Sequence, residues 1–327
     1  MTKLRFLSIV AAMAICATAS PAQTKWYKID KQFIDRNFPP DSAIGELQAS
    51  ESHPAASVHR VGCGGDDGEL HVGIPGRAVL RSNSRGLPVS ASAAGPAGDF
   101  GIVAEPPNAT RQMRNLLAGV QNQQIVFEGY YRVWNEGHDV GAVHPSNPHH
   151  VLELHPAWAF RAGAARSGSP AAVFPMANYQ GYGASKFRPV LESVVVERWP
   201  KAAEDDDFLY VQLKRAENFY QLPVRVRRRA TVSGGSEFVV DVYSSAARTR
   251  PPVFPGLAVV VADGSPIAGQ LRAGQDTFLL GLFSVNPRKA LTAARGRRGM
   301  TQAVFAREAL EFFAFGVPLR PAVGSCN

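Results

Sequence analysis

The sequence predicts a mainly β protein with two β-rich regions, of which the second ends in a helix. Apolar and polar residues alternate with a period of two at several places, as at Leu70, Val72 and Ile74, and this period is typical of strands. The 327 residues include 30 glycines and 24 prolines, too many for a helical bundle. Hydrophobic residues make up 45% and charged residues 19%, which excludes a globally disordered chain and a polytopic membrane protein.

The first 22 residues have the layout of a secretory signal peptide. Lys3 and Arg5 give a positive start, residues 6–19 are apolar, and the small residue Ala22 precedes Gln23. The apolar stretch is shorter than the roughly 20 residues that a membrane-spanning helix needs. We therefore expect cleavage before Gln23, a periplasmic or secreted protein, and no membrane span in the mature chain. An uncleaved anchor is the alternative.

Export would bring the chain into an oxidising compartment, where disulfides form. Without the signal peptide, only Cys63 and Cys326 remain. We predict a disulfide between them, which would tie the first region to the C-terminal end; two separate thiols are the alternative.

The first region is predicted to begin with a helical segment over residues 23–45, because Trp26, Ile29, Phe33 and Ile34 recur at near-helical spacing. A β domain over residues 46–163 follows. Its predicted strands are 70–74, 102–104, 125–134 and 150–160, with a helix that begins at Asn108. Pro156 lies inside the last of these strands, which predicts an edge position or a bend there.

Residues 164–185 are rich in Gly, Ala, Ser and Pro and are predicted to be a linker or long loop. The second β-rich domain is expected over residues 186–320. Its final element is predicted to be a helix over about 301–315, since Phe305, Ala309, Phe312 and Phe313 form an apolar stripe. The predicted strands are 190–196, 208–213, 222–229, 237–243, 257–261 and 277–283.

Four short segments follow one another in a fixed order: residues 67–71 (DGELH), 103–108 (VAEPPN), 126–130 (VFEGY) and 152–156 (LELHP). In this order they resemble a group of uncharacterised bacterial OB-fold-like proteins with a DGxxH, AExP, VxG and ExHP pattern. The resemblance covers about residues 58–161. It implies a five-stranded OB barrel with a helix between strands three and four, and it implies no reaction, because the activity of the group is not established.

Histidine and glutamate supply the candidate chemistry. Alternation places Glu69 and His71 on one face of their strand, and Glu153 and His155 on one face of theirs. If these strands are neighbours, the groups converge, and together with Glu105 they could form a metal or acid–base site. The preferred interpretation is a hydrogen-bonded network that fixes the strands. A catalytic site of His71, Glu105, Glu153 and His155, with His71 and His155 as ligands of zinc or another divalent metal, is the alternative.

A basic stretch supplies a second candidate. On a strand, Arg225, Arg227 and Arg229 share one side and could bind an anion. Tyr130 and Trp134 could offer a face on which nucleic-acid bases stack. A solvated basic surface is the alternative.

The sequence therefore predicts an exported, non-catalytic binding or interaction protein of the cell envelope, with no cofactor. Its partner could be an anionic ligand or an envelope component. Two alternative functions remain: a metal-dependent hydrolase, for example a phosphoesterase, and a nucleic-acid or polyanion binder.

Overall fold

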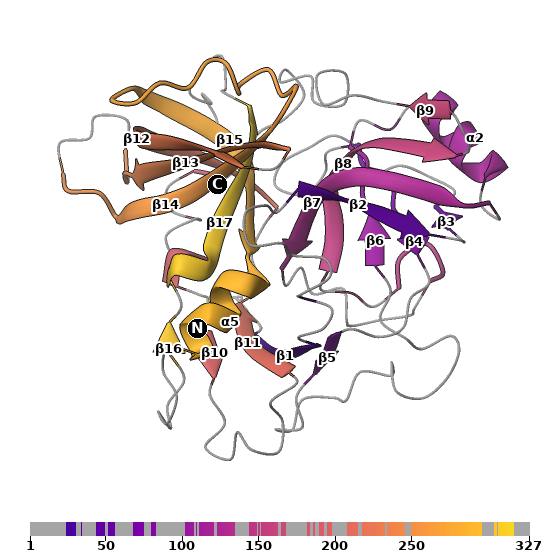
Figure 1. Cartoon of the computed structure of the whole chain (residues 1–327), viewed down its shortest axis with the longest axis horizontal. Helices are drawn as coiled ribbons and strands as arrows, with labels where there is room; N and C mark the ends of the chain where they lie inside the picture. Colours follow the sequence, from indigo (N-terminus) through magenta and orange to yellow (C-terminus); the bar gives the residue numbers. More distant parts are fainter. Residues whose placement is uncertain are drawn as a thin grey trace, which may run out of the picture.

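A computed structural model of the chain forms three β-sheets and two helices among the residues that it describes (Figure 1). The described residues are 24–30, 34, 44–49, 52–55, 68–74, 80–82, 102–107, 109, 111–120, 123–134, 144–148, 150, 152–162, 165–167, 182–183, 186, 190–192, 195–197, 208–214, 218–232, 234–245, 250–295, 304–305 and 307–316.

One sheet, here called the N-terminal sheet, has the strand order β2-β7-β8-β6-β4-β3, with β9 paired to β8. Strands β6 and β8 run parallel, whereas β7–β8, β4–β6 and β2–β7 are antiparallel. Helix α2 (Arg111–Gly119) lies between β6 and β7 in the chain. The strands are β2 (Ile44–Ala49), β3 (His53–Pro54), β4 (Val72–Ile74), β6 (Ile102–Ala104), β7 (Ile125–Val133), β8 (Leu152–Ala162) and β9 (Ala165–Ser167).

The second sheet closes on itself as a five-stranded barrel with the order β12-β13-β14-β17-β15, here called the C-terminal barrel. Strands β14 and β17 are its parallel pair. Helix α5 (Pro287–Arg295) follows β15 in the chain. The strands are β12 (Phe219–Val232), β13 (Gly235–Val242), β14 (Phe254–Ala262), β15 (Asp276–Val285) and β17 (Leu310–Gly316).

A third sheet joins segments that lie far apart in the sequence, in the order β16-β10-β11-β1-β5. Figure 1 shows it below the other two. It combines one strand that precedes the first predicted β domain with strands from within both domains: β1 (Thr24–Asp30), β5 (Leu80–Ser82), β10 (Val195–Glu197), β11 (Phe208–Lys214) and β16 (Val304–Phe305).

The mainly β class is confirmed, and the alternating segments form strands for the expected reason. In β13, in β14 and in β12 as far as Val226, alternate side chains enter the barrel interior; Val224 and Val226, for example, are fully buried. Burial of such apolar area is worth about 25 cal/mol per Å². The helix predicted to follow Asn108 is α2, whose Leu117 reaches the core.

Two helix predictions are wrong. Residues 24–30 form strand β1, and residues 310–316 form strand β17 instead of a C-terminal helix. Strand β17 lies between β14 and β15 inside the closed barrel, so Phe312 and Phe313 are buried although they point to opposite sides. A strand buried on both faces has a continuous apolar sequence, and such a sequence does not distinguish it from a helix.

Strand β8 is interior, because it pairs with both β7 and β6. Pro156 is tolerated there because the β7–β8 register shifts on either side of Gly129, next to the cis peptide bond between His155 and Pro156. The predicted bend therefore occurs, but at a bulge within the sheet and not at an edge.

The N-terminal sheet packs directly on the C-terminal barrel. The ring of Tyr130 stacks on Phe313 with centroids 4.5 Å apart, and its hydroxyl accepts a 2.6 Å hydrogen bond from the amide of Ala262. Trp158 and Phe219 belong to the same apolar contact. None of the helices among the described residues is both long and apolar enough to cross a bilayer.

Candidate functional site

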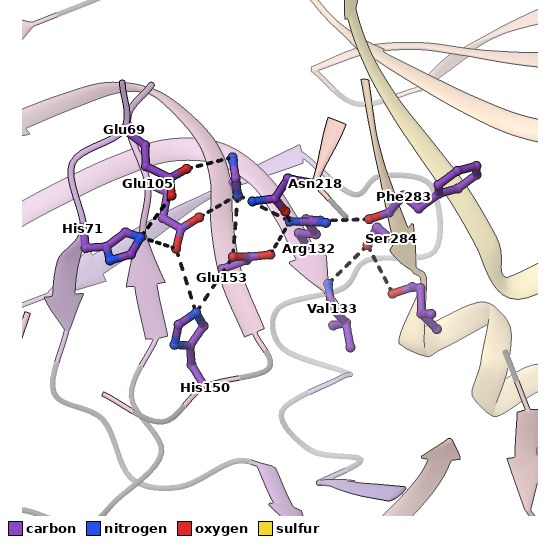
Figure 2. Close-up of polar contacts among 12 residues, drawn as sticks. Glu69, His71, Glu105, Arg132, Val133, His150, Glu153, Asn218, Phe283 and Ser284 are labelled. Carbon is purple, nitrogen blue, oxygen red and sulfur yellow. Dashed lines mark hydrogen bonds and ion pairs between the residues drawn. The ribbon is translucent and has the colours of Figure 1, made fainter. Parts of the chain in front are cut away.

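Six titratable side chains converge on one face of the N-terminal sheet, and all are buried (Figure 2). None is more than 6% exposed. Alternation along β8 explains this location. Leu152 and Leu154 enter the hydrophobic core, so Glu153 and His155 face the opposite side of the sheet. The cluster consists of Glu69, His71, Glu105, His150, Glu153 and His155, and is here called the His–Glu cluster.

Three neighbouring strands position the cluster. Glu69 and His71 immediately precede β4, Glu105 follows β6, and Glu153 and His155 lie in β8. The backbone of Glu105 is held on both sides, because its amide donates to Leu154 O at 3.0 Å and its carbonyl accepts from the amide of Ala157 at 3.1 Å. Glu105 therefore projects from a fixed backbone position.

The ring of His155 lies between two carboxylates. Its Nδ1 is 2.6 Å from Glu105 Oε2, and its Nε2 is 3.6 Å from Glu69 Oε2. The ring also meets Phe219 of the barrel edge to face, with centroids 5.9 Å apart. Both ring nitrogens therefore face acidic oxygens, and an apolar side chain from the barrel packs against the ring.

His71 and His150 approach from two other directions. The Nε2 of His71 is 3.1 Å from Glu69 Oε1 and 3.5 Å from Glu105 Oε1. The Nε2 of His150 is 3.9 Å from both Glu105 Oε1 and Glu153 Oε2, while its Nδ1 is 2.7 Å from Pro148 O. If Nδ1 donates to that carbonyl, the tautomer leaves a lone pair on Nε2, facing the carboxylates.

A close backbone approach fixes the segment that leads to His150. A Cβ atom on Gly73 of β4 would lie only 1.9 Å from Pro145 O. Only glycine allows the segment over residues 144–148 to lie so close to β4.

Arg132 of β7 borders the cluster and joins it to the barrel region. Its Nη1 donates to Glu153 Oε1 and to Asn218 Oδ1, both at 2.7 Å, and its Nε donates to Phe283 O at 2.8 Å. The side chain is fully buried. Figure 2 shows it on the opposite side of the cluster from His71.

The two central carboxyl groups have opposite pKa shifts. Burial raises the pKa of Glu105 well above its usual range, and the charges of Glu153 and Glu69 raise it further, against a lowering by His155. Burial would also raise the pKa of Glu153, but the Arg132 guanidinium, followed by His155 and His150, holds it far below its usual range. Without a cation, Glu105 therefore tends to be protonated while Glu153 is ionised.

The donor atoms form two groups with the spacing of a metal site. Glu69, His71 and Glu105 make one, and Glu105, Glu153 and His155 make the other; within each group the ligand atoms all lie within 4.8 Å of one another. Glu105 belongs to both.

The structure brings together all four residues that the sequence singled out as catalytic candidates: His71, Glu105, Glu153 and His155. It adds His150, Arg132 and Asn218. The adjacent histidines His149 and His150 are evident in the sequence, but their position in a loop does not indicate where either side chain lies. Arg132 alternates with apolar residues in β7, yet nothing in the sequence indicated that Asn218 would meet it.

The structure does not expose the predicted binding residues as a stacking or anion-binding surface. Tyr130 and Trp134 are each 1% exposed, so their rings cannot stack on a base from solvent. Arg225 pairs with both carboxylate oxygens of Asp276, Arg227 pairs with Asp241, and Arg229 donates to Ser236 Oγ. The positive charges of Arg225 and Arg227 are therefore matched by acids, which weakens the polyanion hypothesis.

Cys63 and Cys326 lie outside the described residues, as does the predicted signal peptide, so the disulfide and export stay predictions.

No protein-family model matches the chain. No curated protein matches it at a significant level either. The resemblance to the OB-fold-like group is therefore neither supported nor opposed by these comparisons.

Proposed function

We propose that this protein binds a divalent transition-metal cation in the His–Glu cluster. One observation carries the proposal: two groups of histidine and glutamate donors, with ligand atoms within 4.8 Å of one another, lie in the interior. Exposed acidic groups often meet without a ligand, whereas burying charged groups together is costly unless something compensates the charge.

The charges of the cluster favour a cation. Three carboxylates meet one arginine, so the site carries two excess negative charges when all three are ionised and the histidines are neutral. Oxygens Oε1 of Glu105 and Oε2 of Glu153 are buried and have no hydrogen bond to the described residues. A dication would balance the charge and take up these lone pairs.

The donor set and its spacing fit a first-row transition metal. Mixed imidazole and carboxylate ligands are typical of Zn²⁺, Fe²⁺ and Mn²⁺ sites. Ca²⁺ prefers sites made only of oxygen ligands, and Cu⁺ prefers thiolates. A tetrahedral ion with bonds of about 2.0–2.1 Å holds its ligand atoms roughly 3.3 Å apart. The separations of His71 Nε2 from Glu69 Oε1 and from Glu105 Oε1 are 3.1 and 3.5 Å.

Burial favours metal binding without catalysis over the hydrolase alternative. A metal-dependent hydrolase keeps a coordination position open to its substrate. All six residues of the cluster are at most 6% exposed, and Phe219 packs against His155. We infer an exported metal-binding protein in which the ion stabilises or is stored by the chain.

The test is metal analysis of the mature protein, purified without a histidine tag, stripped with a chelator and dialysed against Zn²⁺. We expect at least one equivalent of bound zinc in the wild type and nearly none in His155→Ala. His144→Ala is the matched control, because His144 is exposed and belongs to the same region of the chain; it should keep its zinc. A folded wild type without zinc, whatever the state of the variants, would reject the proposal and favour a metal-free hydrogen-bonded network.

We also propose that the N-terminal sheet is an OB-like barrel in which β2 and β3 are two halves of one interrupted first strand. The support is the pairing: β2 pairs with β7, β3 pairs with β4, β6 and β8 are parallel, and α2 lies between β6 and β7. With β2 and β3 joined, this is the connectivity of a five-stranded barrel with a helix between strands three and four. An experimental structure with a gap between β2 and β3 would contradict it.

A further inference from the structure

We infer that the His–Glu cluster is a dinuclear centre, in which Glu105 bridges two divalent transition-metal ions. The inference rests on the proposed metal-binding function and specifies its stoichiometry. Glu69 and His71 would hold one ion, Glu153 and His155 the other.

The division into two groups argues against one ion that touches every donor. Glu69 and His71 satisfy the 4.8 Å spacing with Glu105, and Glu153 and His155 satisfy it with Glu105, but the five residues do not form one such group. Figure 2 shows the same arrangement, with His71 at one end of the cluster and Glu153 toward Arg132 at the other. A single ion would leave a histidine and a carboxylate of the other group unused.

The two oxygens of Glu105 face different histidines. Glu105 Oε1 is 3.5 Å from His71 Nε2, whereas Glu105 Oε2 is 2.6 Å from His155 Nδ1. Among the described residues Oε1 has no hydrogen bond and Oε2 has only this contact with His155, although the side chain is fully buried. A carboxylate with one oxygen toward each metal is the usual bridge between ions about 3.5–4 Å apart.

The surroundings of Glu105 suit a bridge. Its backbone amide and carbonyl are both bonded to β8, at 3.0 and 3.1 Å, so the side chain has a fixed origin between the two groups. His150 Nε2 lies 3.9 Å from Glu105 Oε1 and from Glu153 Oε2 and can complete the coordination of either ion.

Charge sets the order of binding. The first dication neutralises the two excess negative charges described above. The second adds two positive charges, so it binds more weakly; a water that loses one proton to solvent and stays between the ions as hydroxide would lower this excess to one positive charge.

The test is a titration of metal-free protein with Mn²⁺, followed by equilibrium dialysis with metal analysis and by electron paramagnetic resonance. We expect about two equivalents of Mn²⁺ in the wild type, with the six-line signal of isolated Mn²⁺ weakening as the second ion couples to the first. Glu69→Gln should bind about one equivalent with the uncoupled signal, because only one group loses a ligand. Glu105→Gln should abolish the coupling.

Glu128→Gln is the control, since Glu128 lies in β7 outside the cluster and pairs with Arg161. It should bind and couple as the wild type does. One equivalent in the folded wild type, unchanged in folded Glu69→Gln, would overturn the dinuclear inference and leave metal binding intact. No bound Mn²⁺ and no bound Zn²⁺ in the wild type would overturn both. If Glu105→Gln does not fold, the wild type and Glu69→Gln decide.

Discussion

The N-terminal sheet and the C-terminal barrel have similar strand arrangements but bury different kinds of side chain. Each contains one parallel pair of strands, β6–β8 in the sheet and β14–β17 in the barrel, among antiparallel neighbours. The interior of the barrel is apolar, with side chains such as Phe238, Val240 and Phe312. The sheet also has an apolar core, but on its other face it buries three glutamates and three histidines.

The difference teaches that similar strand arrangements can bury either an apolar or a polar set of side chains, and that the residues at a few positions decide which. The donors occupy positions just before β4, just after β6, and just before and within the first part of β8. The barrel then covers that face with Phe219 and supplies Asn218 to Arg132. Function resides in sites placed on a fold, and here one region supplies the donors while the other helps to seal them.

The largest expected effect is in the barrel. Phe312→Ala removes a fully buried ring that meets Phe283 with centroids 5.1 Å apart, and should lower the free energy of unfolding by about 3–5 kcal/mol. The loss should be the same with or without a chelator, because among the described residues the groups with metal-site spacing all lie outside the barrel. Urea unfolding under both conditions measures it. A loss that depends on the chelator would mean that the two regions are not chemically distinct.

Metal removal should affect the sheet next. If the free ion is present at 100 to 1,000 times its dissociation constant, binding stabilises the folded state by about 2.7–4.1 kcal/mol. A chelator should therefore lower the melting temperature of the wild type but not that of His155→Ala. Differential scanning calorimetry compares the two, and equal shifts in both proteins would argue against stabilisation through this cluster.

Gly73→Ala should displace only the part of the cluster around His150. The Cβ of Gly73→Ala would overlap Pro145 O, so the segment over residues 144–148 must move, at a cost of about 1–3 kcal/mol. We expect weaker metal binding together with lower stability. Gly119→Ala is the matched control, because nothing lies within 4 Å of the added carbon; it should keep full metal affinity. Unchanged metal affinity in Gly73→Ala would remove His150 from the centre.

The stability of the metal-free protein should depend on pH through Glu105. Because the pKa of Glu105 is raised in the folded protein, its contribution to stability is fully present below its ordinary pKa and is lost as the pH rises through the raised value. The stability of the metal-free protein should therefore fall over that range, and the fall should be absent in Glu105→Gln, which mimics the protonated acid. Chemical unfolding at a series of pH values measures it. The groups that face Glu105 are Glu69, His71, His150, Glu153 and His155.

The smallest expected effect is on the outer surface of the barrel. Arg225 and Asp276 form an exposed pair, and exposed ion pairs contribute little to stability. Arg225→Gln should leave the melting temperature and metal content nearly unchanged. A clear loss of heparin binding in this variant would instead restore the polyanion hypothesis.

The sequence predicted the strands that carry or border the cluster, β4, β6, β7 and β8, and the four central site residues, because both depend on alternation within short segments. Glu153 and His155 share a face in any strand, whatever surrounds it. Asn218 could not be predicted, since it lies 86 positions from Arg132 and meets it only through the packing of the two regions. Residues 310–316 were wrongly predicted as a helix because the strand is buried on both faces. Such burial removes the alternation of apolar and polar residues on which strand prediction depends.

The contacts of Arg132 with Phe283 O and Asn218 bear on how fast a bound ion would exchange with solvent. The donors of the cluster all lie before residue 156, and the strands of the barrel that cover them come later in the chain. If the cluster binds an ion as proposed, the ion can therefore enter during synthesis, while the face is still open. The docked barrel would hinder the exit of an ion, because Phe219 packs against His155 and the cluster residues are at most 6% exposed. Exchange with solvent should then be slow even if equilibrium affinity is modest, and it should accelerate under the same mild denaturant that parts Arg132 from the barrel.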